Sequence, residues 1–165
     1  MQSYVASLLE TLDAAGAEFR AAPSAAAARR PAAGVWSPQE VIGHLIDSAA
    51  NNHHRFVRAQ WQDDLVFPGY DQEAWVAAQR YLEAPWLELI ALWQAYNRHI
   101  ARVMAATPAG VLNRAHVRHN LDQIAWRTVP AGQPATLDYF MNDYVGHLHH
   151  HVAQIRERLA VGSAS

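Results

Sequence analysis

Apolar residues recur at steps of three and four along four long stretches of the chain, which is the pattern of amphipathic helices. The stretches predict helices near 3–20, 38–60, 85–106 and 136–159. A weaker pattern predicts a short helix over 71–80. No convincing pair of strands accompanies them. The pattern therefore favours an all-α fold, a four-helix bundle of antiparallel type.

The segments between these helices are less regular. Residues 22–34 are rich in alanine and proline and predict a linker over the surface, and residues 107–134 lack a clear period. With 165 residues, the chain is long enough for one domain with a sizeable core, which we expect to span 1–165.

The start of the second helix carries the clearest local signal. Ser37 and Glu40 have the S-x-x-E spacing of a capping box, and Pro38 falls at the first helical position, where its missing N–H is not needed. His44 follows Glu40 by four residues and is flanked by apolar neighbours. This histidine is therefore expected on a helix, not on a loop.

Four of the ten histidines lie in one stretch of five residues, 147–151, within the last predicted helix. His147 and His151 are four residues apart, so their side chains share one helix face and could bind one metal ion. The intervening residues lack the glutamate of the H-E-x-x-H protease helix, so a protease reading is poor. His149 is expected to face solvent. The alternative is a solvated histidine-rich face with no function.

A two-histidine site needs another protein ligand, and His44 is the best candidate. Asp47, Asn51 and Arg55 follow it at steps that could line the same groove, as a substrate pocket. Alternatively, these residues only form a polar edge of the helix, with no part in a pocket.

Two residues of the last helix are candidates beside the histidines. Asp143, one turn before His147, could hold the second ring N–H of a histidine. Tyr144 could offer its hydroxyl to a ligand or serve as a core aromatic. A rival reading pairs Glu40 with His44 and Asp143 with His147 in a two-metal carboxylate site. Ferritin-like sites use a different spacing, Glu-x-x-His, which disfavours this reading.

Composition narrows the function further. The net charge of −2 provides no basic field for nucleic acid, and no apolar run reaches the length of a membrane span. The first residues do not resemble a signal peptide, so we expect a cytoplasmic protein. The sequence contains no cysteine and no lysine. Thiolate and Schiff-base nucleophiles are therefore excluded.

The motifs W-S-x-x-E-V-x-x-H-L and H-x-x-H-H-x-x-Q-I resemble the DinB/YfiT-like superfamily of metal-dependent four-helix bundles. The resemblance implies one metal ion on His44, His147 and His151, with His150 as a non-ligand. It also implies a kinship with bacterial enzymes that transfer low-molecular-weight thiols.

The expected function is thus that of a metal-dependent enzyme acting on a small molecule. A divalent zinc, nickel or iron ion is the expected cofactor, and a low-molecular-weight thiol is a candidate cosubstrate. Family resemblance favours thiol S-transfer. The alternatives are hydrolysis by metal-activated water and a non-catalytic binding module with a structural metal. A homodimer is one option for the assembly.

Overall fold

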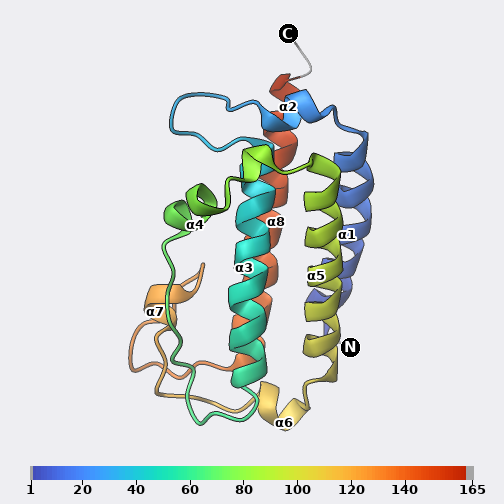
Figure 1. Cartoon of the computed structure of the whole chain (residues 1–165). Coiled ribbons are helices and arrows are strands. Elements are labelled where there is room, and N and C mark those ends of the chain that lie inside the picture. Colours follow the sequence, from blue (N-terminus) through green and yellow to red (C-terminus); the bar gives the residue numbers. More distant parts are fainter. Residues whose placement is uncertain (1, 163–165) are drawn as a thin grey trace.

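The computed structural model describes residues 2–162, and four long helices form its body (Figure 1). These are α1 (Ser3–Ala21), α3 (Pro38–Arg58), α5 (Trp86–Ala106) and α8 (Leu137–Gly162). The connections carry the short helices α2 (Ser24–Ala28), α4 (Gln72–Gln79), η1 (Tyr81–Glu83), α6 (Ala109–Leu112) and α7 (Leu121–Ile124). Over residues 2–162 there is no strand, only two isolated bridges, Leu65 with His119 and His116 with Ala135. The predicted all-α four-helix bundle is confirmed.

The direction of the helices differs in part from the expected antiparallel arrangement. Figure 1 shows α1 and α8 running one way and α3 and α5 running the other. Neighbours α1 and α5 are antiparallel, as are α3 and α8, but α3 and α5 are parallel. The connection 59–85, which contains α4, makes this possible because it returns the chain along the bundle before α5 begins.

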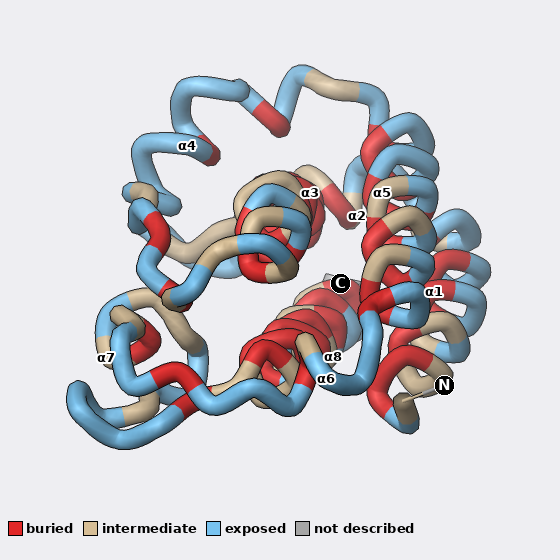
Figure 2. Tube along the Cα trace, turned by 90° about the horizontal axis from the view of Figure 1, so that it is seen from below, coloured by how far each residue is buried: buried red, intermediate tan, exposed pale blue. Residues whose placement is uncertain are grey.

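The core lies where the four long helices face one another, as the end-on view in Figure 2 shows. Its largest fully buried side chains include Trp93, Phe19, Phe56 and Phe140. Phe19 of α1 packs on Trp93 of α5, while Phe56 of α3 meets Phe140 of α8 edge-on with a centroid separation of 5.5 Å. Aromatic contacts therefore tie both antiparallel pairs together.

The predicted linker over 22–34 contains a helix that the periodicity did not indicate. The alanines after Pro23 form α2, and Ala27 is fully buried. Alanine has the highest helix propensity, so this run can form one turn once it packs against α3 and α8. The linker prediction was wrong for this part of the segment.

Among the described residues, no helix combines the length and the apolar character needed to cross a membrane.

Candidate metal centre

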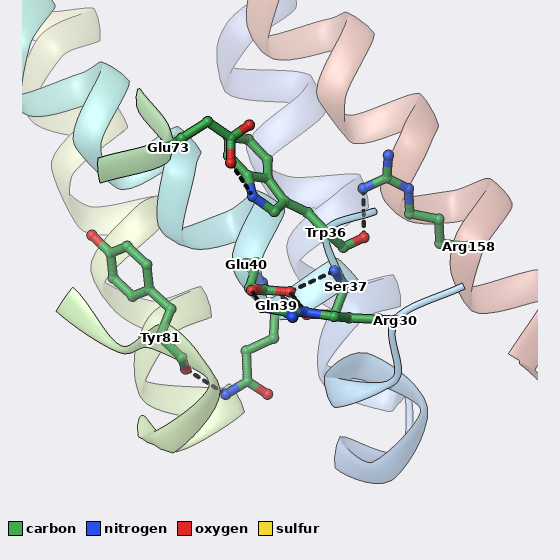
Figure 3. Close-up of polar contacts among 8 residues, drawn as sticks. All are labelled: Arg30, Trp36, Ser37, Gln39, Glu40, Glu73, Tyr81 and Arg158. Atoms are coloured by element: carbon green, nitrogen blue, oxygen red, sulfur yellow. Dashed lines mark hydrogen bonds and ion pairs between the residues drawn. The ribbon is translucent and has the colours of Figure 1, made fainter. Parts of the chain in front are cut away.

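The N-terminus of α3 is held by polar contacts from several parts of the chain (Figure 3). The capping box is present: Glu40 N–H donates to Ser37 Oγ, and Ser37 N–H donates to Glu40 Oε2 at 2.9 Å. Arg30 Nε donates to the same carboxylate at 2.9 Å. Arg158 of α8 donates to the carbonyl oxygen of Trp36 at 2.8 Å, which joins this end of α3 to α8. The cap therefore sets both the start of α3 and its position against α8.

Nearly two turns into α3, His44 meets two histidines of α8. His44 Nε2 lies 3.4 Å from His147 Nε2, and His147 Nε2 lies 3.0 Å from His151 Nε2. Each residue offers one ring nitrogen, and these nitrogens lie within 4.8 Å of one another. The structure thus brings together the three histidines that the sequence singled out, from helices that are far apart in the chain.

Burial keeps these imidazoles neutral. It lowers the pKa of His44 and of His147 to about 3, and that of His151 to about 4. The neighbouring imidazoles add to the effect at each position, since a second positive charge nearby is unfavourable. Near pH 7 all three rings therefore present lone pairs, which is the form that binds a metal ion.

The side chain of Gln154, within the quoted C-terminal motif, selects the tautomer of one ring. Its Oε1 lies 2.9 Å from His151 Nδ1 and its Nε2 lies 2.9 Å from His150 Nε2. His151 Nδ1–H donates to the amide oxygen, which leaves Nε2 as the acceptor facing the other rings. The sequence reading gave Gln154 no role, although its i+3 spacing from His151 could have indicated one.

Two of the three nitrogen spacings match those around a single ion. Nitrogens bound at about 2.0–2.1 Å are roughly 3.3 Å apart around a tetrahedral ion and about 2.9 Å apart at right angles. The observed 3.4 and 3.0 Å fall close to these two values. His44 Nδ1 is buried without a hydrogen-bond partner, so only its Nε2 is engaged within the cluster. His44, His147 and His151 could therefore hold one ion.

Two tryptophans wall the cluster. Trp36 lies against the His44 ring with a centroid separation of 5.2 Å, and Trp126 lies 5.6 Å from the ring of His150. A Cβ at Gly146 would come within 3.0 Å of Trp126, so a glycine there allows this ring to approach α8.

A cavity of about 380 Å³ opens beside the cluster, and His44 and His147 both line it. Its polar lining on α3 consists of His44, Ser48, Asn52 and Arg55. Tyr70 and Trp126 also contribute to the lining. The cavity thus borders two of the three clustered histidines.

The predicted ladder of Asp47, Asn51 and Arg55 is only partly correct. Arg55 lines the cavity, but Asp47 and Asn51 do not. The Asp47 carboxylate is buried on the side of α3 that meets Tyr81, where it accepts hydrogen bonds from Tyr81 Oη at 2.6 Å and Gln79 Nε2 at 2.5 Å. Asn51 donates to the carbonyl oxygen of Asp47.

The sequence reading missed Ser48 and Asn52, which lie at i+4 and i+8 from His44. At about 100° per residue, Ser48 is turned about 40° to one side of His44 and Asp47 about 60° to the other. Both positions suited a groove equally well in sequence. The helix face that meets α8 decides between them.

Asp143 does not hold a histidine. Its two carboxylate oxygens accept hydrogen bonds from the backbone N–H groups of Trp126 and Arg127, both at 2.8 Å. Since Glu40 is likewise engaged in the cap, the two-metal carboxylate reading is wrong. Tyr144 lines the cavity, but its hydroxyl donates to Asn97 Oδ1 and is not offered to a ligand.

The remaining histidines of the cluster point away from the three nitrogens. His149 faces α1, where its Nε2 lies 3.0 Å from Thr11 Oγ1. The expectation that it faces solvent was wrong, because parallel packing of α1 on α8 covers it. His150 is exposed and contacts Gln154.

Comparisons with known proteins agree with this architecture. A sequence model described as the DinB superfamily matches residues 5–155. The "Putative metal-dependent hydrolase YfiT" of Bacillus subtilis (strain 168) is 25% identical over 124 residues, which cover 75% of this chain and 64% of that protein. The chain therefore matches slightly less than two thirds of the relative's length.

A solved structure of YfiT from Bacillus subtilis, described as "a probable metal-dependent hydrolase with an unusual four-helix bundle topology", has the same fold. The TM-score is 0.74 at 21% sequence identity, over 94% of this chain and 83% of that one.

Proposed function

Because this chain belongs to the DinB superfamily, we propose that it is a metal-dependent enzyme in which His44, His147 and His151 hold one divalent ion. The observation that carries the proposal is the convergence of three neutral imidazole nitrogens beside a cavity that His44 and His147 line. Zinc, nickel and iron all suit histidine ligands. A small molecule fits the volume of the cavity.

We further propose that the reaction is transfer of a low-molecular-weight thiol to an electrophilic small molecule. When bound to three neutral imidazoles, a divalent ion would supply a Lewis acid that favours the deprotonated form of a thiol or of water. The chain has no cysteine thiol and no lysine amine, so a thiol nucleophile would have to come from outside the chain.

The surroundings of the histidines favour a thiol over water. The carboxylate in the cavity lining is that of Asp143, and it already accepts two backbone hydrogen bonds. The Tyr144 hydroxyl donates to Asn97. Neither is free to act as a general base. A thiol has a pKa of about 8.5 and loses its proton near neutrality with less assistance than water needs.

Hydrolysis is the second candidate, and one observation favours it. The relative carries the name "Putative metal-dependent hydrolase YfiT", and 75% of this chain aligns with it. The same three histidines and the same cavity would serve either reaction.

The first experiment concerns the ion. Metal content is measured after purification without nickel affinity chromatography, for the unmodified chain and for single alanine variants. His44→Ala, His147→Ala and His151→Ala are expected to lose stoichiometric metal. His149→Ala is the matched control, since it lies on the same helix but faces Thr11, and it should retain the ion. Equal losses in all four variants would show a diffuse histidine cluster without a defined site.

The second experiment concerns the reaction. Low-molecular-weight bacterial thiols are paired with electrophilic substrates and tested beside simple esters and amides. We expect turnover with the thiols that chelation removes and a divalent ion restores. Metal-dependent turnover of esters or amides alone would select hydrolysis. Loss of stability on chelation, with no turnover in any assay, would identify the ion as structural.

A further inference from the structure

The cavity extends away from the histidines along α3 and ends at a second polar region. Arg55 lies eleven residues after His44, which corresponds to about 16 Å along a helix axis. Helical side chains lean back towards the N-terminus, so the guanidinium points towards the histidine end. Both residues line the same cavity, with Ser48 and Asn52 between them.

Arg55 is a buried cation without an acidic partner. Only 4% of the residue is exposed, yet among residues 2–162 no carboxylate forms an ion pair with it. Its hydrogen bonds go to two neutral acceptors, the carbonyl oxygen of Pro68 at 2.8 Å and Asn52 Oδ1 at 3.4 Å. A buried charge is normally paired, because burial removes its hydration. The guanidinium thus remains available to an anion that enters the cavity.

Neither Asp143, which lines the cavity, nor Asp47, which is buried on α3, neutralises Arg55. Asp143 uses both oxygens on backbone N–H groups at the histidine end. Asp47 forms no ion pair with Arg55, and its Oδ1 accepts hydrogen bonds from Tyr81 and Gln79.

Neighbouring groups suit an anion with an apolar body. Tyr70 lines the cavity, and burial raises its pKa to about 12, so its hydroxyl keeps its proton near pH 7. Phe140 and Ile124 add apolar wall to the cavity. A ligand with one charged end and an apolar middle would match this lining.

We propose that Arg55 binds a carboxylate of the substrate, at the opposite end of the cavity from the histidines. A planar guanidinium pairs with a carboxylate through two parallel hydrogen bonds. One buried cation balances one negative charge, whereas a phosphate dianion would leave an unpaired charge in the cavity. The inference rests on the proposed function only in assigning the reacting group to the histidine end. It narrows the substrate class to carboxylic acids whose reactive group is remote from the carboxylate.

The test uses 4-phenylbutyrate as a probe, with 4-phenylbutyramide as its uncharged counterpart and 3-phenylpropyl phosphate as the dianion. Binding to the full chain is measured by calorimetry and ligand-observed NMR, as purified and again after chelation. Arg55→Gln is expected to weaken binding of the carboxylate by about ten- to a hundredfold, the range for hydrogen bonds to charged groups. Arg58→Gln, one turn further along α3 and outside the cavity, is the matched control and should bind like the unmodified chain.

Each outcome decides the matter. Preference for the carboxylate over the amide, lost in Arg55→Gln and retained in Arg58→Gln, supports the proposal. Equal binding of acid and amide, tighter binding of the phosphate, or no binding at all would overturn it. Carboxylate binding that disappears on chelation but survives Arg55→Gln would place the acid on the ion, which also overturns it.

Further measurements distinguish carboxylate binding by Arg55 from a purely structural role. They also show whether the carboxylate site holds if the proposed enzyme function fails. Arg55→Lys keeps the charge, so it should retain part of the affinity even if Arg55→Gln proves unstable. Thermal unfolding without the probe tests whether Arg55 only stabilises the segment at Pro68. In that case both variants would have a lower unfolding midpoint, and the unmodified chain would not prefer the acid over the amide. Arg55-dependent binding after chelation, with no turnover in any assay, would leave the carboxylate site standing while the proposed enzyme fails.

Discussion

Replacing Gln154 with leucine should weaken metal binding although Gln154 is not a ligand. The Gln154 amide oxygen lies 2.9 Å from His151 Nδ1 and holds the ring in the tautomer that presents Nε2. Leucine has a similar size but cannot accept this hydrogen bond. Loss of such an outer contact typically lowers metal affinity 10- to 100-fold, which is about 1.4–2.8 kcal/mol. Because the other two histidines are untouched, the variant should still bind one ion per chain.

The assay is a competition titration in which metal-free protein and a chromophoric chelator share zinc at neutral pH. Gln154→Glu keeps an acceptor at the same place, so its affinity should equal or exceed that of the unmodified chain. His150→Ala is the control for the second contact of the amide, which lies 2.9 Å from His150 Nε2. An affinity of Gln154→Leu within twofold of the unmodified chain, or equal losses in the leucine and glutamate variants, would refute the tautomer argument.

Three further predictions concern stability. A Cβ at Gly43 would lie 2.1–2.5 Å from ring atoms of Tyr81. Gly43→Ala should therefore lower the free energy of unfolding, measured in urea, by about 1–3 kcal/mol. Gly110→Ala, with open space around it, should not, and equal effects would contradict the packing argument. Ser37→Ala removes the side-chain cap of α3 and should cost about 0.5–2 kcal/mol by the same measurement, while Ser24→Ala, which removes no cap, serves as its control. Metal-free protein should lose stability as the pH falls below about 6.5, because unfolded histidines then bind protons that the three buried rings, with pKa values of about 3 to 4, do not. The loss should approach 1.4 kcal/mol per pH unit for each histidine, and urea curves that coincide at pH 7 and pH 5 would contradict it.

The extent of each long helix was predictable because it depends on neighbours in sequence. The four predicted ranges match α1, α3, α5 and α8 closely at their starts, and the capping box at Ser37 is present as expected. The pairing of His147 with His151 is of the same kind, since residues four apart on a helix share a face wherever the helix is placed. Short helices such as α2 were missed, because so few residues are helical only when packing supports them.

The residues that pack against each helix could not be predicted from its neighbours in sequence. Asp47 and Ser48 flank the position of His44 almost equally, and only the neighbours of α3 decide that Ser48 enters the cavity while Asp47 meets Tyr81. Asp143 suited a contact with a histidine equally well, but the loop at 126–127 supplies two N–H donors that take its oxygens.

The amino-acid sequence by itself determined the helices, their apolar faces and the residue types available for chemistry, because periodicity, capping and composition act within a few residues. Only the tertiary structure decided that α3 runs parallel to α5 and antiparallel to α8 and that His149 lies against α1. It also decided that Arg55 is buried beside a cavity, and no ion pair joins it to a carboxylate among residues 2–162. These features depend on contacts between residues distant in the chain, where many arrangements satisfy the same local pattern and packing of the whole core selects one.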